Sequence, residues 1–167
     1  MVLLVSILGL GPCKNLEISE EVKASTQIKE IIKKYEGFRA DPYYCVGGYC
    51  TVGYGHVLPK GTKKSVTKEE ADELFEKDLA KTESAVSRLV VQRLTQNQFD
   101  ALVSFTFNLG PGTLQRSTLR RKINRGEMQD APREFLKYVY ASGKKWPGLQ
   151  RRRATEASLF SITDRNS

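Results

Sequence analysis

The stretch that decides the fold is YEGFRADPYYCVGGYCTVGYGH, residues 35–56. Two runs of β-prone residues, 43–46 and 49–52, are separated by the pair Gly47-Gly48. Glycine pairs favour the tight turns of β-hairpins, because those turns need positive φ at their central positions. The sequence therefore predicts a β-hairpin with Gly47-Gly48 as its two-residue loop.

A helix is predicted directly before this stretch. Either Ser25 or Thr26 can be its N-cap, because a hydroxyl there can accept a hydrogen bond from the first turn. The apolar residues of this segment recur at i, i+3, i+4 and i+7, which places them on one helix face. They are Ile28, Ile31, Ile32 and Tyr35. We expect the helix to end near Gly37, since glycine readily adopts positive φ at a helix C-terminus.

Beyond a further turn predicted over residues 53–61, the chain is predicted to be helical. Two capping boxes mark helix starts, Thr67-x-x-Glu70 and Thr95-x-x-Gln98. The first opens a long amphipathic run that can bridge two lobes, and the second opens an apolar stripe that ends at Gly-Pro-Gly, residues 110–112. Shorter helices are predicted over 117–124, 128–140 and 149–160.

Together these elements predict an α+β fold, with a small N-terminal β-hairpin lobe and a larger helical lobe. A long helix joins the lobes, and a cleft is expected between them. We expect residues 25–163 to form this domain and residues 1–24 to be an apolar N-terminal segment and tether. Residues 1–12 are apolar except for Ser6, but a membrane span takes roughly 20 apolar residues. A degenerate export signal or weak signal anchor, the end of a longer one, and an apolar arm packed on the domain are all consistent with this pattern.

The composition is that of a globular protein with an excess of positive charge. Of 167 residues, 40% are apolar and 28% charged, and the net charge is +8. Such a charge either serves solubility or indicates an anionic partner: nucleic acid, an anionic membrane or an acidic polymer such as a cell wall. No nucleic-acid-binding motif accompanies the charge, so composition does not favour DNA or RNA.

The cysteines leave the redox state open. The chain has three, Cys13, Cys45 and Cys50, and a single histidine, His56, so a structural zinc site is not expected. With Gly47-Gly48 as the hairpin loop, Cys45 faces Cys50, and a cross-strand disulfide is within range if the two residues form a non-hydrogen-bonded pair. One disulfide with one thiol left over, or three reduced thiols, both fit an odd count.

Residues 35–56 resemble the active-site region of the phage lysozymes of glycoside hydrolase family 24. That family carries a Glu, eight residues, an Asp or sometimes a Cys, five residues, and a Thr. Here residues 37–44 separate Glu36 from Cys45, and residues 46–50 separate Cys45 from Thr51, so both gaps match. Further matching motifs are LTQNQFDAL (94–102), FTFNLG (105–110), STL (117–119), PGL (147–149) and RRxxE (152–156).

The resemblance implies roles for individual residues. Glu36 is expected to be the general acid, although a glutamate at a helix end is most often a solvated surface residue. Cys45 takes the position that most members fill with Asp, as base, nucleophile or holder of a water. A thiol is a poorer fixed anion than a carboxylate, because its free pKa lies near 8.5. Thr51 is expected to help hold the water or the reacting sugar; otherwise it is a β-branched residue chosen for its strand.

Three further residues complete the expected site. Asn108 corresponds to a polar side chain in the cleft that contacts substrate. Arg152 or Arg153 corresponds to an arginine that pairs with the catalytic glutamate; the alternative is a solvated basic face. His56 is expected to be a supporting, hydrogen-bonded turn residue rather than a catalytic one.

The resemblance thus implies an endolysin that hydrolyses the β-1,4 bond between N-acetylmuramic acid and N-acetylglucosamine in peptidoglycan, without metal or cofactor. A lytic transglycosylase that uses Glu36 alone, an inactive basic wall-binding protein and, more weakly, a nucleic-acid-binding protein are the alternatives. We expect a monomer that acts in the host periplasm on peptidoglycan, not on nucleic acid. It would arrive by export or a signal anchor, with membrane contact through its N-terminal segment, or through a holin.

Overall fold

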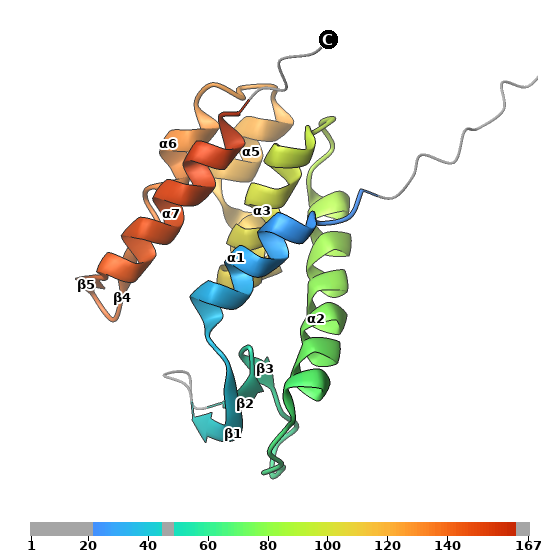
Figure 1. Ribbon diagram of the computed structural model, residues 1–167. Coiled ribbons are helices and arrows are strands. Elements are labelled where there is room, and N and C mark those ends of the chain that lie inside the picture. Colours follow the sequence, from blue (N-terminus) through green and yellow to red (C-terminus); the bar gives the residue numbers. More distant parts are fainter. Residues whose placement is uncertain (1–21, 45–48, 163–167) are drawn as a thin grey trace, which may run out of the picture.

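The computed structural model describes residues 22–44 and 49–162 (Figure 1). The first helix, α1, leads into a three-stranded sheet, and helices follow. In chain order the elements are α1 (Thr26–Glu36), β1 (Arg39–Tyr44), β2 (Cys50–Gly53), β3 (His56–Val57), α2 (Lys68–Leu89), α3 (Gln96–Leu109), α4 (Pro111–Arg116), α5 (Thr118–Asn124), α6 (Ala131–Phe135), β4 (Tyr140–Ala141), β5 (Lys144–Lys145) and α7 (Pro147–Phe160). This is the predicted α+β arrangement.

Helix α1 has the caps that the sequence predicts. The Ser25 side chain accepts a hydrogen bond from the backbone N–H of Ile28, which makes Ser25 and not Thr26 the N-cap. At the other end Gly37 has φ 71°, and its N–H donates to the carbonyl of Lys33. The helix thereby stops at Glu36 and the chain turns into the sheet.

The sheet is antiparallel with strand order β1-β2-β3, and its register differs from the predicted one. Tyr44 pairs with Cys50 and Tyr43 pairs with Thr51, so residues 45–49 connect the strands. The predicted two-residue loop would place Cys45 opposite Cys50, so the predicted register is wrong by one residue. Strand β1 is mostly exposed and has no alternation of buried side chains that could specify register. Cys45 itself lies outside the described residues.

Helices α2 and α3 begin at the two predicted capping boxes. In each, the threonine side chain accepts from the backbone of the residue three positions on, and that residue's side chain accepts from the threonine N–H. Helix α2 is 22 residues long and runs from the sheet along the side of the helical body (Figure 1). It is the long connecting helix that the sequence predicts.

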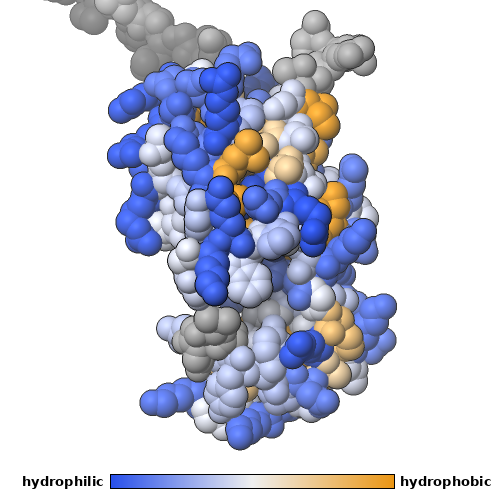
Figure 2. Space-filling view, turned by 90° about the vertical axis from the view of Figure 1, so that its left-hand side faces the viewer, coloured by the Kyte–Doolittle hydropathy of each residue, from blue (hydrophilic) through white to orange (hydrophobic). Residues whose placement is uncertain are grey.

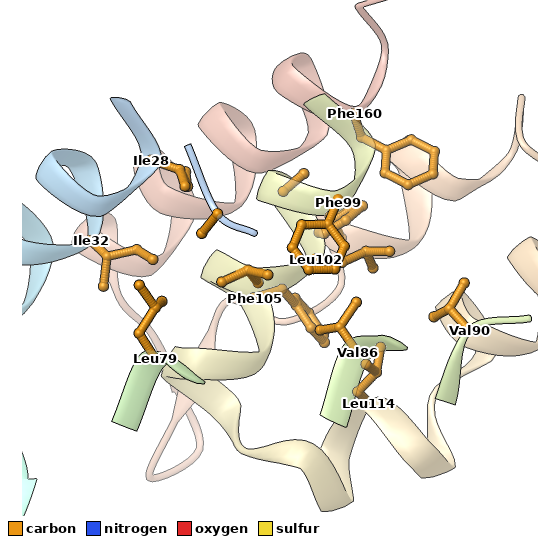
Figure 3. Packing of buried hydrophobic residues seen from close by; sticks show 14 of the residues in the cluster. Ile28, Ile32, Leu79, Val86, Val90, Phe99, Leu102, Phe105, Leu114 and Phe160 are labelled. Carbon is orange, nitrogen blue, oxygen red and sulfur yellow. The ribbon is translucent and has the colours of Figure 1, made fainter. Parts of the chain in front are cut away.

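The core of the helical body is centred on α3. All residues from Phe99 to Thr106 are buried, because α1, α2, α4 and α7 pack around this helix. Figure 3 shows side chains from these helices converging on Leu102 and Phe105. Among the described residues, none of the helices has the length and hydropathy that a membrane span requires.

In the C-terminal third, α5 and α7 follow the helices predicted over 117–124 and 149–160, whereas residues 111–116 and 128–145 differ from the prediction. Gly110 ends α3, but Pro111 also starts a helix, α4, as proline is favoured at a first helical position. The helix predicted over 128–140 is reduced to α6, and Tyr140 belongs instead to the hairpin β4–β5. Ser142 and Gly143 at its tip have φ 50° and 75°, which suits a two-residue turn.

Candidate active site

Glu36 lies where α1 ends and the chain enters the sheet. Its side chain is 20% exposed, so the carboxylate is accessible but largely surrounded by protein. Oε1 accepts a hydrogen bond of 2.6 Å from Nη1 of Arg152 on α7. Oε2 faces the turn between β2 and β3, where a Cβ added at Gly55 would lie 3.8 Å away. The carboxylate is therefore at the junction of the β lobe and the helical body.

Arg152 is fixed by three different partners. Besides Nη1 to Glu36, its Nη2 donates to the carbonyl of Ser104 at 3.1 Å and its Nε donates to Oε1 of Glu156 at 3.3 Å. The guanidinium also lies over the ring of Tyr35, 5.2 Å from its centroid. Because the guanidinium is planar and its donors have a fixed geometry, these contacts set the direction of the bond to Glu36.

Arg153 occupies a fully buried position beside Arg152. Its Nη2 donates to Oδ1 of Asn108 at 2.9 Å and to Oε1 of Glu156 at 3.1 Å, and its Nε lies 3.0 Å from Oε2 of Glu156. Burial lowers the pKa of Arg153 to about 10, and burial raises the pKa of the Glu156 carboxyl. The solvated basic face considered for residues 151–153 is thus wrong for Arg152 and Arg153, which are 3% and 0% exposed.

The remaining expected site residues have separate partners. Thr51 is buried on β2, and its hydroxyl donates to the carbonyl of Tyr43 at 3.3 Å. His56 on β3 contacts Asp78 of α2 through Nδ1 and Oδ2, 2.6 Å apart, which links the sheet to the long helix. Asn108 is linked to the cluster by its side chain, whose Oδ1 accepts a hydrogen bond from Arg153.

Two members of this cluster are less evident in the sequence. Glu156 lies in the RRxxE motif, and its spacing from Arg152 and Arg153 places all three on one face of α7. Ser104 is a polar residue within the apolar stripe of α3, and its hydroxyl donates to Oε1 of Glu156 at 2.7 Å. A polar residue among the buried residues of a helix indicates that its side chain has a hydrogen-bond partner, and this was the signal in the sequence for Ser104.

Chemically, this arrangement presents one accessible carboxyl group backed by buried cations. The face of the molecule seen in Figure 2 is mostly hydrophilic, and it narrows between the helical body and the β lobe. Among the described residues, no group of three or more His, Cys, Asp or Glu side chains is arranged to hold a metal ion. A partly buried carboxyl at such a junction suits proton transfer to a polar substrate.

Comparison with known proteins gives consistent relatives. The Phage lysozyme family matches residues 33–156. An endolysin of Acyrthosiphon pisum secondary endosymbiont phage 1 is 38% identical over 134 residues, which cover 78% of this chain and 92% of that protein. A SAR-endolysin of Escherichia phage Mu is 36% identical over 121 residues, covering 72% of this chain and 71% of that protein.

A solved structure extends this similarity to the fold. The muramidase domain of SpmX from Asticaccaulis excentricus superposes with a TM-score of 0.76 at 38% identity, over 84% of this chain and 99% of that one. The matched family region contains both ends of the Glu36–Arg152 contact. The chain belongs to the phage lysozyme family.

Proposed function

We propose that this phage lysozyme hydrolyses the β-1,4 bond between N-acetylmuramic acid and N-acetylglucosamine in peptidoglycan, with Glu36 as proton donor. The observation that carries the proposal is the position of Glu36, a carboxyl that is partly exposed at the junction of the two lobes and held by Arg152. A glycosidase needs such a group to protonate the leaving oxygen, and a second group to supply or activate the nucleophile.

Thr51 and Cys45 are proposed for the second part of the reaction. The support is their spacing from Glu36, together with the burial of Thr51 on β2, the strand that leads into the turn facing Glu36. In this proposal Thr51 helps to hold the attacking water or the sugar, and Cys45 assists as a polar or ionised group. Asn108 is proposed to contact substrate, and Arg152 supports Glu36 directly.

The proposed place of action is the host periplasm. Similarity to SAR-endolysins supports export through an N-terminal membrane anchor. Residues 1–24 would form that segment and tether, with the lysozyme domain over residues 25–163. Passage through a holin is the alternative route, and the protein would act on peptidoglycan as a monomer.

Glu36→Gln tests the role of Glu36. The amide keeps the shape of the side chain but cannot donate the proton, so lysis of outer-membrane-permeabilised Gram-negative cells should fall by about 10²–10⁴-fold. Glu30→Gln is the matched control, since Glu30 is an exposed residue of the same helix and should leave the rate unchanged. A Glu36→Gln protein that folds and keeps more than roughly a tenth of the activity would contradict the proposal.

Product analysis separates hydrolysis from the transglycosylase alternative. A hydrolase adds water and leaves reducing ends, whereas a lytic transglycosylase makes anhydro-muropeptides because the sugar's own hydroxyl attacks. Mass spectrometry of digested sacculi distinguishes the two products. Anhydro-muropeptides as the main product would overturn the hydrolase proposal while leaving Glu36 as the acid.

A further inference from the structure

The contact between Glu36 and Arg152 creates a difficulty for a proton donor. Oε1 of Glu36 accepts a hydrogen bond of 2.6 Å from the guanidinium of Arg152, whereas a general acid must carry a proton when it meets the substrate. A second cation, Arg153, follows directly in α7 and is completely buried. Two guanidinium groups thus follow one another in α7, and one of them contacts Glu36 directly.

Glu156 is placed to offset their positive charge. Its carboxylate is 1% exposed, and Oε1 accepts from Arg152 Nε, Arg153 Nη2 and Ser104 Oγ at 3.3, 3.1 and 2.7 Å. The serine hydroxyl comes from α3, so the carboxylate is held from outside its own helix. One oxygen of Glu156 thereby contacts both guanidinium groups that flank the site.

We propose that Glu156 is a positioning residue that fixes Arg152 and offsets the charge of Arg153, so that Glu36 can hold a proton beside a guanidinium. This inference rests on the proposed role of Glu36 as proton donor. Glu156 would not touch substrate; it would act through Arg152. It would set the pH range over which Glu36 remains a useful acid.

The charges of the cluster support this assignment. Helix α1 contributes Glu36 and the Tyr35 phenol, α7 contributes Arg152, Arg153 and Glu156, and α3 contributes the uncharged side chains of Ser104 and Asn108. Two carboxylates and two guanidiniums sum to zero when Glu36 is ionised and to +1 when it is protonated. Without Glu156 these sums become +1 and +2.

Accumulating positive charge at buried positions is unfavourable, because little solvent is available to screen it. A cluster that has lost Glu156 would therefore favour release of the Glu36 proton. Burial lowers the pKa of Arg153 to about 10, in the direction expected for a cation removed from solvent. Both arginines form ion pairs with Glu156, and this carboxylate is buried away from solvent.

The test compares the pH dependence of lysis for the full chain and for Glu156→Gln. The amide preserves the shape and can still accept a hydrogen bond from Ser104, but it removes the negative charge. We expect the alkaline limb of the rate profile to move down by about one pH unit. Titration of the Glu36 side-chain carboxyl by 13C NMR should show its midpoint moving in the same direction, independently of activity.

The matched control is Glu134→Gln. Glu134 is also buried and is also ion-paired with two cations, Lys122 and Lys137, but it lies on α6 outside the cluster. Its loss should affect stability without moving the rate profile.

A second variant, Arg153→Gln, removes a positive charge from the cluster. It should move the alkaline limb of the rate profile to higher pH. Combining it with Glu156→Gln should return the limb towards that of the parent.

The outcomes separate the two proposals. An unchanged profile and unchanged NMR midpoint in Glu156→Gln, or a shift of both to higher pH, would overturn the role of Glu156. If Glu156→Gln does not fold, the test relies on Arg153→Gln. A rate profile and a Glu36 NMR midpoint that stay constant or move to lower pH in Arg153→Gln would then overturn the role of Glu156. If instead Glu36 is not the proton donor, Glu36→Gln stays active, while the NMR midpoint of Glu36 in Glu156→Gln still reports on the positioning role.

Discussion

The hydroxyl of Thr51 makes a long hydrogen bond to the backbone of Tyr43, with 3.3 Å between the oxygens. Removing such a bond should cost no more than about 0.5–1.5 kcal/mol of folding free energy. If the hydroxyl has the proposed role towards water or sugar, Thr51→Ala should fold normally and lose most of its activity. Urea denaturation and the lysis assay measure the two effects separately. Thr51→Ser, which keeps the hydroxyl, should recover activity; full activity in Thr51→Ala would instead assign Thr51 to the strand alone.

Among the elements, strand β2 and helix α2 approach one another closely at Gly53. Gly53 has φ 63°, and an added Cβ would lie 2.9 Å from the Cβ of Ala71. Gly53→Ala should therefore lower the free energy of unfolding by at least about 2 kcal/mol, from backbone strain and overpacking together. Because Thr51 is on the same strand, activity should also decline. Denaturant unfolding and the lysis assay provide the measurements.

Gly61→Ala separates the two causes. Gly61 has φ 86°, but nothing lies within 4 Å of an added Cβ, so only the backbone cost of about 1 kcal/mol is expected. The difference between the two variants then measures the packing of β2 on α2. Equal destabilisation by both would mean that the close approach does not contribute.

The junction of α1 and α2 carries a pH-dependent contact between Lys33 and Asp72, 2.7 Å apart. The hydrogen bond from Lys33 lowers the pKa of the Asp72 carboxyl. A lowered pKa in the folded state means that the contribution is present above the unfolded value of about 3.9 and is lost as pH falls through the folded value. Asp72→Asn should thus destabilise the protein by less than about 1 kcal/mol at neutral pH, since Asp72 is partly exposed.

The measurement is denaturant unfolding of parent and Asp72→Asn from pH 7 down into the acid range. The two stabilities should converge as Asp72 becomes protonated. Glu73→Gln, at the exposed neighbouring position, should follow the parent. A constant difference at all pH values would show that the ion pair is not its cause.

At the scale of the whole molecule, positive charge predominates. With 27 Lys and Arg against 19 Asp and Glu, the net charge is +8, which favours adsorption to an anionic cell wall. Binding of the Glu36→Gln variant to isolated sacculi, which avoids digestion during the assay, should weaken as NaCl is raised. The Debye length shortens from about 10 Å at 0.1 M to about 3 Å at 1 M salt. Salt-independent adsorption would mean that specific contacts, not the overall charge, retain the protein on the wall.

An aromatic chain connects the two lobes within this molecule. The rings of Phe38, Tyr54, Phe75 and Phe107 lie in succession with centroids 5.8, 5.7 and 5.4 Å apart. They lead from the start of the sheet through α2 to the end of α3. Spacings in this range suit favourable tilted and edge contacts, so this chain stabilises the junction at which Glu36 lies.

The sequence by itself determined the features that depend on neighbouring residues. The start of α1 at a hydroxyl N-cap (Ser25 or Thr26), its end at Gly37 and the capping boxes at Thr67 and Thr95 each involve groups within a few positions of one another. The long helix and the apolar faces follow from periodicity in the same way. The spacing of Glu36, Cys45 and Thr51, together with the further motifs between residues 94 and 156, indicated the family.

Only the tertiary structure decided the features that join distant segments. The register of β1 on β2 depends on packing against the rest of the protein, and turn composition alone placed Cys50 opposite the wrong residue. Likewise, the sequence left open whether Arg152 or Arg153 faces Glu36, because both sit in one basic run. In the folded protein both arginines are buried. Arg152 donates a hydrogen bond to Glu36, and Arg153 donates one to Asn108. Burial makes an unpaired charge costly, so each guanidinium is held by a specific partner that lies far away in the chain.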